Sequence, residues 1–139
     1  MTKYAAYGTT LKRGGTGGVA VANILSISGP SLELDTEDVT THDSTGAWEE
    51  VVATILRSGE VSFDIAYDPN NATHKNASGG LLADFVARTS QTWAITFPSS
   101  PAVSWSFTAF VTGFEPDAPV DGALTAAVTM KLTGQPTLA

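Results

Sequence analysis

The residues that could do chemistry lie together in one polar stretch. His42 and Asp43 are adjacent, with Asp38 before them and Ser44 after them. A carboxylate, a histidine and a hydroxyl make up a hydrolytic triad, but a triad also needs a fixed nucleophile and an oxyanion hole. No motif in the chain supplies either feature. We therefore interpret these side chains as solvated loop residues and predict that the protein is not an enzyme.

Metal and cofactor sites are not indicated either. The chain has no cysteine, which removes thiolate ligands, a cysteine nucleophile and disulfides. Asp35, Glu37 and Asp38 lack the spacing that wraps oxygens around calcium. The glycine cluster at 14–18 precedes a strand-like run, whereas a phosphate-binding loop needs a helix after it. We expect no metal and no cofactor, and interpret the cluster as a mobile arm or a hairpin turn.

Length and charge narrow the class of protein further. A chain of 139 residues predicts a single domain, 1–139. The net charge of −7 argues against a groove that grips nucleic acid, although nucleic acid could slide past such a surface. No apolar run approaches the roughly 18 residues of a membrane span. The first residues also lack the apolar segment of a secretory signal.

Alternating sequence patterns predict the elements that must position these residues. In the segment 60–67, Val61, Phe63, Ile65 and Tyr67 alternate with small or acidic residues, which is the period of a half-buried strand. Strand-like patterns also occur at 19–27, 32–34, 48–57, 92–97, 104–111 and 125–132. The segment 81–88 instead has helical spacing of its apolar residues. The expected fold is mainly β (α+β): a two-sheet antiparallel β-sandwich or open barrel with one flanking α-helix.

Two segments fall outside these patterns. Residues 1–18 lack periodicity and predict a flexible N-terminal arm, whereas residues 36–50 predict a long acidic loop within the domain. The arm carries Lys12 and Arg13. The loop region carries carboxylates with no Lys or Arg among them: Glu37, Asp38, Asp43, Glu49 and Glu50. We expect both segments to be mobile in a free monomer, since they are polar and have few apolar anchors.

The three tryptophans differ in their predicted environments. Trp93 and Trp105 are in phase with strand residues that point to the core, so core packing is expected for both. Trp48 borders the acidic loop, where it either folds back on the core or anchors an interface. An alternative function is a small β-sandwich module that binds a carbohydrate or protein ligand, for example on Trp48, Trp93 or Trp105, although the strand phase of Trp93 and Trp105 argues against it.

Four stretches, taken together and in order, resemble the major tail tube proteins of long-tailed bacteriophages with non-contractile tails. They are Tyr7–Leu11, Ile27–Leu34, Ser58–Pro69 and Lys131–Pro136. The order of elements is also similar to that family: arm, two strands, acidic loop, strand, helix and final strands. The glycine cluster at 14–18 is richer in glycine than the family pattern.

The resemblance implies a structural virion protein. Such proteins self-assemble into six-fold rings that stack into a hollow tube around a tape-measure protein, and DNA later passes through the lumen during ejection. The implied partners are copies of the chain itself, the tape-measure protein and tail-tip or terminator proteins. The implied location is the virion tail, reached from the host cytoplasm where the tail is assembled. In the family, the arm and the long loop reach neighbouring subunits.

Charge segregation adds a residue-level hypothesis to this resemblance. A basic arm and an acidic loop are complementary halves of a head-to-tail contact between copies. We therefore expect Lys12 and Arg13 of one copy to approach carboxylates of another. The candidate inter-subunit contacts are Lys12, Arg13, Glu37, Asp38, Asp43, Trp48, Glu49 and Glu50. A surplus of carboxylates along a lumen would also repel DNA, which predicts passage without specific binding.

Overall fold

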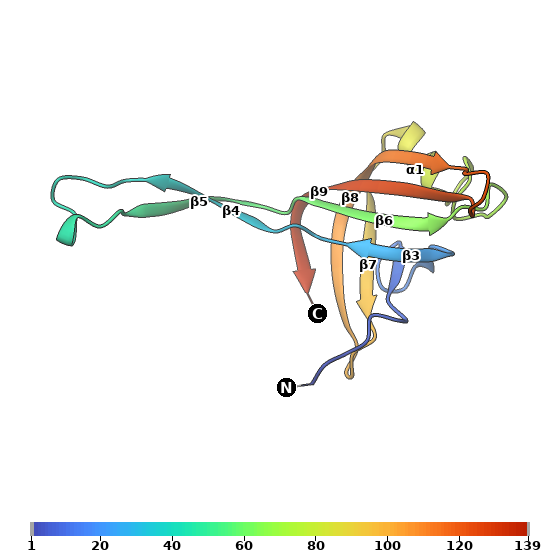
Figure 1. The fold of residues 1–139 in the computed structure, drawn as a ribbon, viewed down its shortest axis with the longest axis horizontal. Coiled ribbons are helices and arrows are strands. Elements are labelled where there is room, and N and C mark those ends of the chain that lie inside the picture. The colour runs from blue at the N-terminus through green and yellow to red at the C-terminus, as the bar shows by residue number, and fades with distance from the viewer. Residues whose placement is uncertain (1, 139) are drawn as a thin grey trace.

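The computed structural model describes residues 2–138 and consists mainly of β-strands (Figure 1). Within these residues there is one α-helix and one 3₁₀ turn. The elements are β1 (Thr10–Arg13), β2 (Val19–Ala20), β3 (Ile24–Ser28), β4 (Glu33–Asp38), η1 (Thr45–Ala47), β5 (Val51–Arg57), β6 (Glu60–Ala66), α1 (Leu81–Ala87), β7 (Gln91–Phe97), β8 (Val103–Asp117) and β9 (Thr125–Leu138). The predicted mainly β class with a single helix is confirmed.

Seven strands form one curled antiparallel sheet in the order β2-β1-β7-β8-β9-β6-β3. The long strands β8 and β9 run through its centre and curve along their length (Figure 1). Their pairing shifts register between Ser106 and Thr108 and again between Val111 and Gly113. Such bulges bend a strand and increase its twist, which allows the sheet to curl around a core. Of the two expected architectures, the structure therefore adopts the open barrel.

The core lies inside the curl and follows the alternation of the sequence. Val61, Phe63 and Ile65 of β6 are buried and pair with buried residues of β9, for example Val61 with Met130. Trp93 is fully buried, as predicted, while Trp105 is partly buried and packs against the core. The buried cluster comprises Leu11, Val21, Val61, Phe63, Ile65, Leu81, Trp93, Ile95, Phe107, Ala109, Val111, Ala126, Val128, Met130 and Leu132.

The N-terminal segment contributes a core strand, which corrects the prediction of an unstructured arm over 1–18. β1 pairs with β7, and its Leu11 is completely buried. The prediction failed because a four-residue strand with one core residue shows no periodicity. The glycine cluster forms the turn between β1 and β2, where a Cβ on Gly18 would lie 1.9 Å from the carbonyl oxygen of Arg13.

The single helix matches its prediction closely. It covers Leu81–Ala87, and Arg88 ends it in the left-handed conformation with φ of 58°. The connection that precedes the helix contains a buried histidine, His74. His74 accepts the Asp68 N–H at Nδ1 (3.2 Å), and its Nε2 lies 2.7 Å from the carbonyl oxygen of Ala22. These bonds make His74 a structural residue that ties the connection to the end of β2.

β4 and β5 form a separate two-stranded sheet that projects from the body as a hairpin (Figure 1). This hairpin corrects the predicted loop at 36–50, because Thr36 to Asp38 belong to β4. The connection between the two strands is therefore 39–50, with η1 near its middle. The end of β4 near the tip is polar, so no alternation was visible there, whereas β5 falls within the predicted strand-like segment 48–57. The second sheet does not stack on the first, and the fold is not a sandwich.

Candidate assembly surfaces

The hairpin of β4 and β5 is the most exposed part of the chain that bears apolar side chains. Every residue of β5 is exposed, and no residue of β4 is buried. Its large apolar residues are 50% to 80% exposed: Leu34, Val51, Val52, Ile55 and Leu56. Soluble monomers rarely leave a contiguous apolar patch of this kind uncovered. A two-stranded hairpin without further support is also only marginally stable in water.

The pairing register separates the two faces of the hairpin. Leu34 lies opposite Leu56, and Glu37 lies opposite Val52. The register shifts between Leu34 and Thr36, with the extra residue on β5. Because side chains alternate along β4, Leu34 and Glu37 lie on opposite faces. Asp38, opposite Val51, is on the face of Leu34 and Leu56. The other face carries Glu33 opposite Arg57 and Glu37 opposite Val52. Here Arg57 donates from Nε to Asp35 Oδ2 at 2.8 Å, an exposed ion pair that adds little stability.

Polar side chains order the hairpin tip. The Thr40 N–H donates to Asp38 Oδ1 at 2.9 Å, while Thr40 Oγ1 accepts from the Glu50 N–H at 2.8 Å. Hydrogen bonds from the Thr40 hydroxyl and backbone lower the pKa of Asp38. The backbone bond from Val39 N–H to the Glu50 carbonyl continues the ladder beyond β5. Asp38 therefore remains ionised at neutral pH while it holds the turn.

Trp48 stands at this tip with 77% of its surface exposed. Its backbone is extended, with φ of −78° and ψ of 143°, and its indole lies beside Gly46. Of the two environments left open by the sequence, folding back on the core is therefore wrong. The predicted acidic residues gather in the same region, with Glu37 and Asp38 at the end of β4 and Asp43, Glu49 and Glu50 in the 39–50 connection.

The two predicted basic residues lie elsewhere, on β1. Arg13 makes a two-fold ion pair with Asp84 of α1: Nε to Oδ2 and Nη2 to Oδ1, both at 2.8 Å. Hydrogen bonding to the nearly buried Asp84 raises the pKa of Arg13. Lys12 donates to the Thr16 carbonyl at 3.3 Å. Among residues 2–138 no ion pair joins β1 to the hairpin, and no sequence pattern indicated the Arg13–Asp84 pair.

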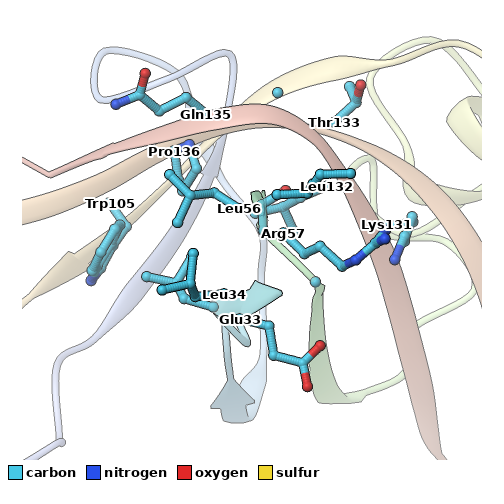
Figure 2. A pocket seen from close by; sticks show the side chains of 15 residues that line it. Glu33, Leu34, Leu56, Arg57, Trp105, Lys131, Leu132, Thr133, Gln135 and Pro136 are labelled. Atoms are coloured by element: carbon cyan, nitrogen blue, oxygen red, sulfur yellow. The ribbon is translucent and has the colours of Figure 1, made fainter. Parts of the chain in front are cut away.

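A groove of about 840 Å³ lies where the base of the hairpin meets β8 and β9. Figure 2 shows Leu34, Leu56 and Pro136 pointing into it, with Trp105 along one side and Arg57 and Lys131 along the other. Lys131 forms no ion pair with any residue in 2–138. The groove is thus an apolar cavity whose rim carries Arg57, Lys131 and the carboxylate of Glu33. Sequence reasoning missed it because its walls come from segments up to about a hundred positions apart.

The edges of the main sheet are further surfaces that a partner could cover. β2 and β3 are the terminal strands of the sheet order, and each has a neighbour on one side only. β3 exposes Leu25, and the segment before β1 exposes Tyr4 and Tyr7. Unpaired edges are a template for strand addition unless they are covered.

The structure offers little support for catalysis or ligand binding. His42 is exposed, and the described residues contain no group of three or more His, Asp or Glu arranged to hold a metal ion. Across 2–138 there is also no helix with the length and apolar character that a membrane crossing requires. The alternative function places a ligand on Trp48, Trp93 or Trp105. Trp93 is buried and Trp105 is partly buried beside the groove, whereas Trp48 is exposed but does not line that groove.

Comparison with known proteins identifies the class to which this architecture belongs. The family model described as lambda phage tail tube protein, TTP, matches residues 6–139. The chain therefore belongs to the lambda phage tail tube protein family, whose members are structural tail proteins and not enzymes. This result confirms the resemblance to tail tube proteins and places the chain in the virion tail. No curated protein sequence matches it.

Solved structures share the fold at low sequence identity. A chain from the virion of a native gene transfer agent (GTA) particle has a TM-score of 0.77 at 14% identity, with 99% of each chain covered. A chain from the tail of an empty GTA particle, solved by helical refinement with C6 symmetry, has a TM-score of 0.73 at 16% identity and the same coverage. A chain from the structure of the PVC sheath/tube terminator in the extended state, part of an extracellular contractile injection system, has a TM-score of 0.73 at 13% identity, with 100% of this chain and 98% of that chain covered.

Proposed function

We propose that this chain, as a single domain over 1–139, self-assembles into stacked hexameric rings that form a tail tube, the conduit for DNA ejection. The observation that carries the proposal is the hairpin, whose strands contain no buried residue in a monomer. Family membership supports a tube subunit, and the C6 symmetry stated for the GTA tail is consistent with six subunits per ring.

Burial of the hairpin supplies the driving force for assembly. Its exposed side chains include four leucine, isoleucine or tryptophan residues that are at least half exposed: Leu34, Trp48, Ile55 and Leu56. Removing apolar surface from water gains about 25 cal/mol per Å² before the costs of association. A neighbouring copy that covers the hairpin would therefore stabilise both the contact and the hairpin itself.

The sheet edges and charges can direct the geometry. Closing copies into a ring would cover the edge strands β2 and β3, whereas contacts between rings remain open-ended. The acidic tip can pair with cations of another copy. Lys12 is available for that role, while the Arg13 contact with a second copy must coexist with its Asp84 pair. Glu37, Asp38, Asp43, Glu49 and Glu50 remain the proposed acidic contacts.

The lumen and the other partners follow from the same model. The net charge of −7 favours a lumen that repels phosphates, so that DNA passes without binding. Retardation of DNA by assembled tubes at moderate salt would contradict this part of the proposal. The tape-measure protein inside the tube, and tail-tip or terminator proteins at its ends, are partners by family resemblance, with assembly in the host cytoplasm.

Negative-stain microscopy of concentrated protein tests the proposal. We expect annuli with six-fold symmetry or hollow filaments, with size-exclusion chromatography showing growth as the concentration rises. A preparation without annuli or filaments, together with full-length tails assembled in the absence of this polypeptide, would overturn it.

A further inference from the structure

We propose that the groove at the base of the hairpin is the receptor for the hairpin tip of a second copy, with Trp48 as the inserted side chain. The inference rests on the proposed self-assembly and names the residues on each side of one contact. The occupant is a second copy of this chain, and the contact joins two different surfaces of the same molecule.

The groove has the shape and composition of an aromatic receptor. Its volume of about 840 Å³ exceeds what one side chain fills, and its walls are apolar at Leu34, Leu56, Trp105 and Pro136 (Figure 2). Interface anchors are enriched in tryptophan and occupy pockets of this kind. Trp48 is the most exposed tryptophan of the chain at 77%, and its position at the tip leaves the indole free to enter.

A chain cannot fill its own groove with its own tip. The groove is lined by the base of the hairpin at Leu34 and Leu56, whereas Trp48 lies at the opposite end of the same hairpin, which extends away from the body (Figure 1). The hairpin would have to fold back on itself and break the β4–β5 pairing. Insertion must therefore occur between copies, and a contact between two different surfaces propagates from copy to copy.

Charge complementarity favours the tip over the other exposed apolar segments. The segment 37–50 carries five carboxylates and no Lys or Arg, and the groove rim carries Lys131 without an intrachain ion pair in the described residues. Glu50 follows Trp48 by two residues, and the backbone of Trp48 is extended. Insertion of Trp48 would bring Glu50 to the rim, where Lys131 lies. The segment with the exposed Tyr4 and Tyr7 carries Lys3 and no carboxylate, so it offers Lys131 no acidic partner.

Cysteine cross-linking of assembled tubes tests the contact, since the wild-type chain contains no cysteine. Glu50→Cys and Lys131→Cys are placed on separate chains with different tags, which are mixed before assembly. We expect an oxidised heterodimer on a non-reducing gel. The control pairs Glu50→Cys with Lys75→Cys, an exposed lysine outside the groove. Tubes in which the Lys131 pair cross-links no more than the Lys75 pair would overturn the docking and leave the proposed function standing.

Charge exchange tests the same contact by a route that does not depend on oxidation. Glu50→Lys and Lys131→Glu should each raise the concentration needed for assembly about tenfold, and the double variant should restore it. Asp121→Lys makes the same charge change in the exposed β8–β9 connection and should have no comparable effect. A double variant no better than either single variant would contradict the pairing.

Truncation of the anchor gives the largest expected effect. Trp48→Ala should raise the assembly concentration roughly 30-fold or more, as truncating an interface tryptophan does, and Trp48→Phe should raise it less. Because Trp48 is exposed, circular dichroism and urea unfolding of the Trp48→Ala monomer should match the wild type. Normal assembly by Trp48→Ala would overturn the inference. Wild-type protein that never assembles would remove the proposed function and this contact together.

Discussion

The curled sheet and the hairpin are built from the same kind of strand but end in opposite environments. In β6, alternate residues are fully buried against β9, whereas in β5 all seven residues are exposed. The sheet carries its apolar residues on one face and covers them by curling. The hairpin carries apolar residues on both faces and has no second layer. The sheet buries its apolar residues within the chain, whereas the hairpin can bury its apolar residues only against another copy.

This difference separates the roles of folding and assembly. Substitutions in the sheet should change the stability of the monomer, because its contacts form within one chain. Substitutions in the hairpin should leave the monomer stable and change the concentration at which copies associate. Matched pairs of variants, with one variant in each region, therefore test whether folding and assembly depend on different parts of the chain.

The sharpest pair changes leucine to alanine in each region. Leu11→Ala empties a completely buried site on β1 and should destabilise the monomer by about 2–5 kcal/mol. Leu56→Ala changes a side chain that is 80% exposed and should alter monomer stability by less than about 0.5 kcal/mol. Urea unfolding measures both. Two equally small losses of stability would mean that β1 is a peripheral arm. Two equally large losses would mean that the hairpin packs on the body.

The two ion pairs offer a second comparison. Asp84→Asn leaves the partly buried Arg13 without its charged acceptor and should reduce the free energy of unfolding by about 1–3 kcal/mol. Asp35→Asn removes the exposed partner of Arg57 and should change it by less than about 1 kcal/mol. Thermal unfolding of both variants in the same buffer shows which substitution lowers the stability more. A larger effect at Asp35 would show that the hairpin is more integrated with the body than its exposure indicates.

Charge reversal at Asp38 should have the smallest effect on the monomer and a clear effect on assembly. Asp38→Lys removes the acceptor for Thr40 and reverses a charge on the proposed contact surface, so tube formation should be impaired while the monomer stays folded. Asp38→Asn keeps an acceptor but removes the charge, which separates the two contributions.

The ionisation of Asp38 defines the conditions for that comparison. Because folding lowers its pKa, the ionised turn stabilises the folded state at neutral pH, and this contribution is lost only as the pH falls through the lowered pKa. Microscopy at neutral pH therefore compares fully charged wild type with the variants. Normal tubes from Asp38→Lys would contradict a role for this charge in assembly.

Local patterns sufficed to predict much of the fold. The alternation at 60–67 and 125–132 marked buried strands, and the helical spacing at 81–88 marked the helix. These predictions succeeded because each element buries one face, which leaves a period in the sequence. β4 and β5 bury neither face, so selection for a core could not impose a period on them. The strand-like segments 32–34 and 48–57, the acidic character of the loop and Trp48 were visible, but the extension of β4 to Asp38 and the pairing of the two strands were not.

Non-local contacts account for the rest. Arg13 and Asp84 are 71 positions apart, and no local pattern links them. The buried position of His74 depends on the carbonyl of Ala22, which lies 52 positions away. The groove likewise combines Leu34 and Leu56 with Trp105 and Pro136, so it exists only after the sheet has curled. Such sites follow from topology, which single-sequence reasoning reaches only through a family resemblance.

Hydrogen exchange on the free monomer and on assembled tubes tests the central claim most directly, namely that the hairpin completes its burial on another copy. Amides of β7, β8 and β9 should be protected in both states, since their ladder forms within the chain. Amides of 33–57 should exchange quickly in the monomer and become protected in the tube. Fast exchange of 33–57 in tubes that have formed normally, or full protection in the monomer, would contradict the account.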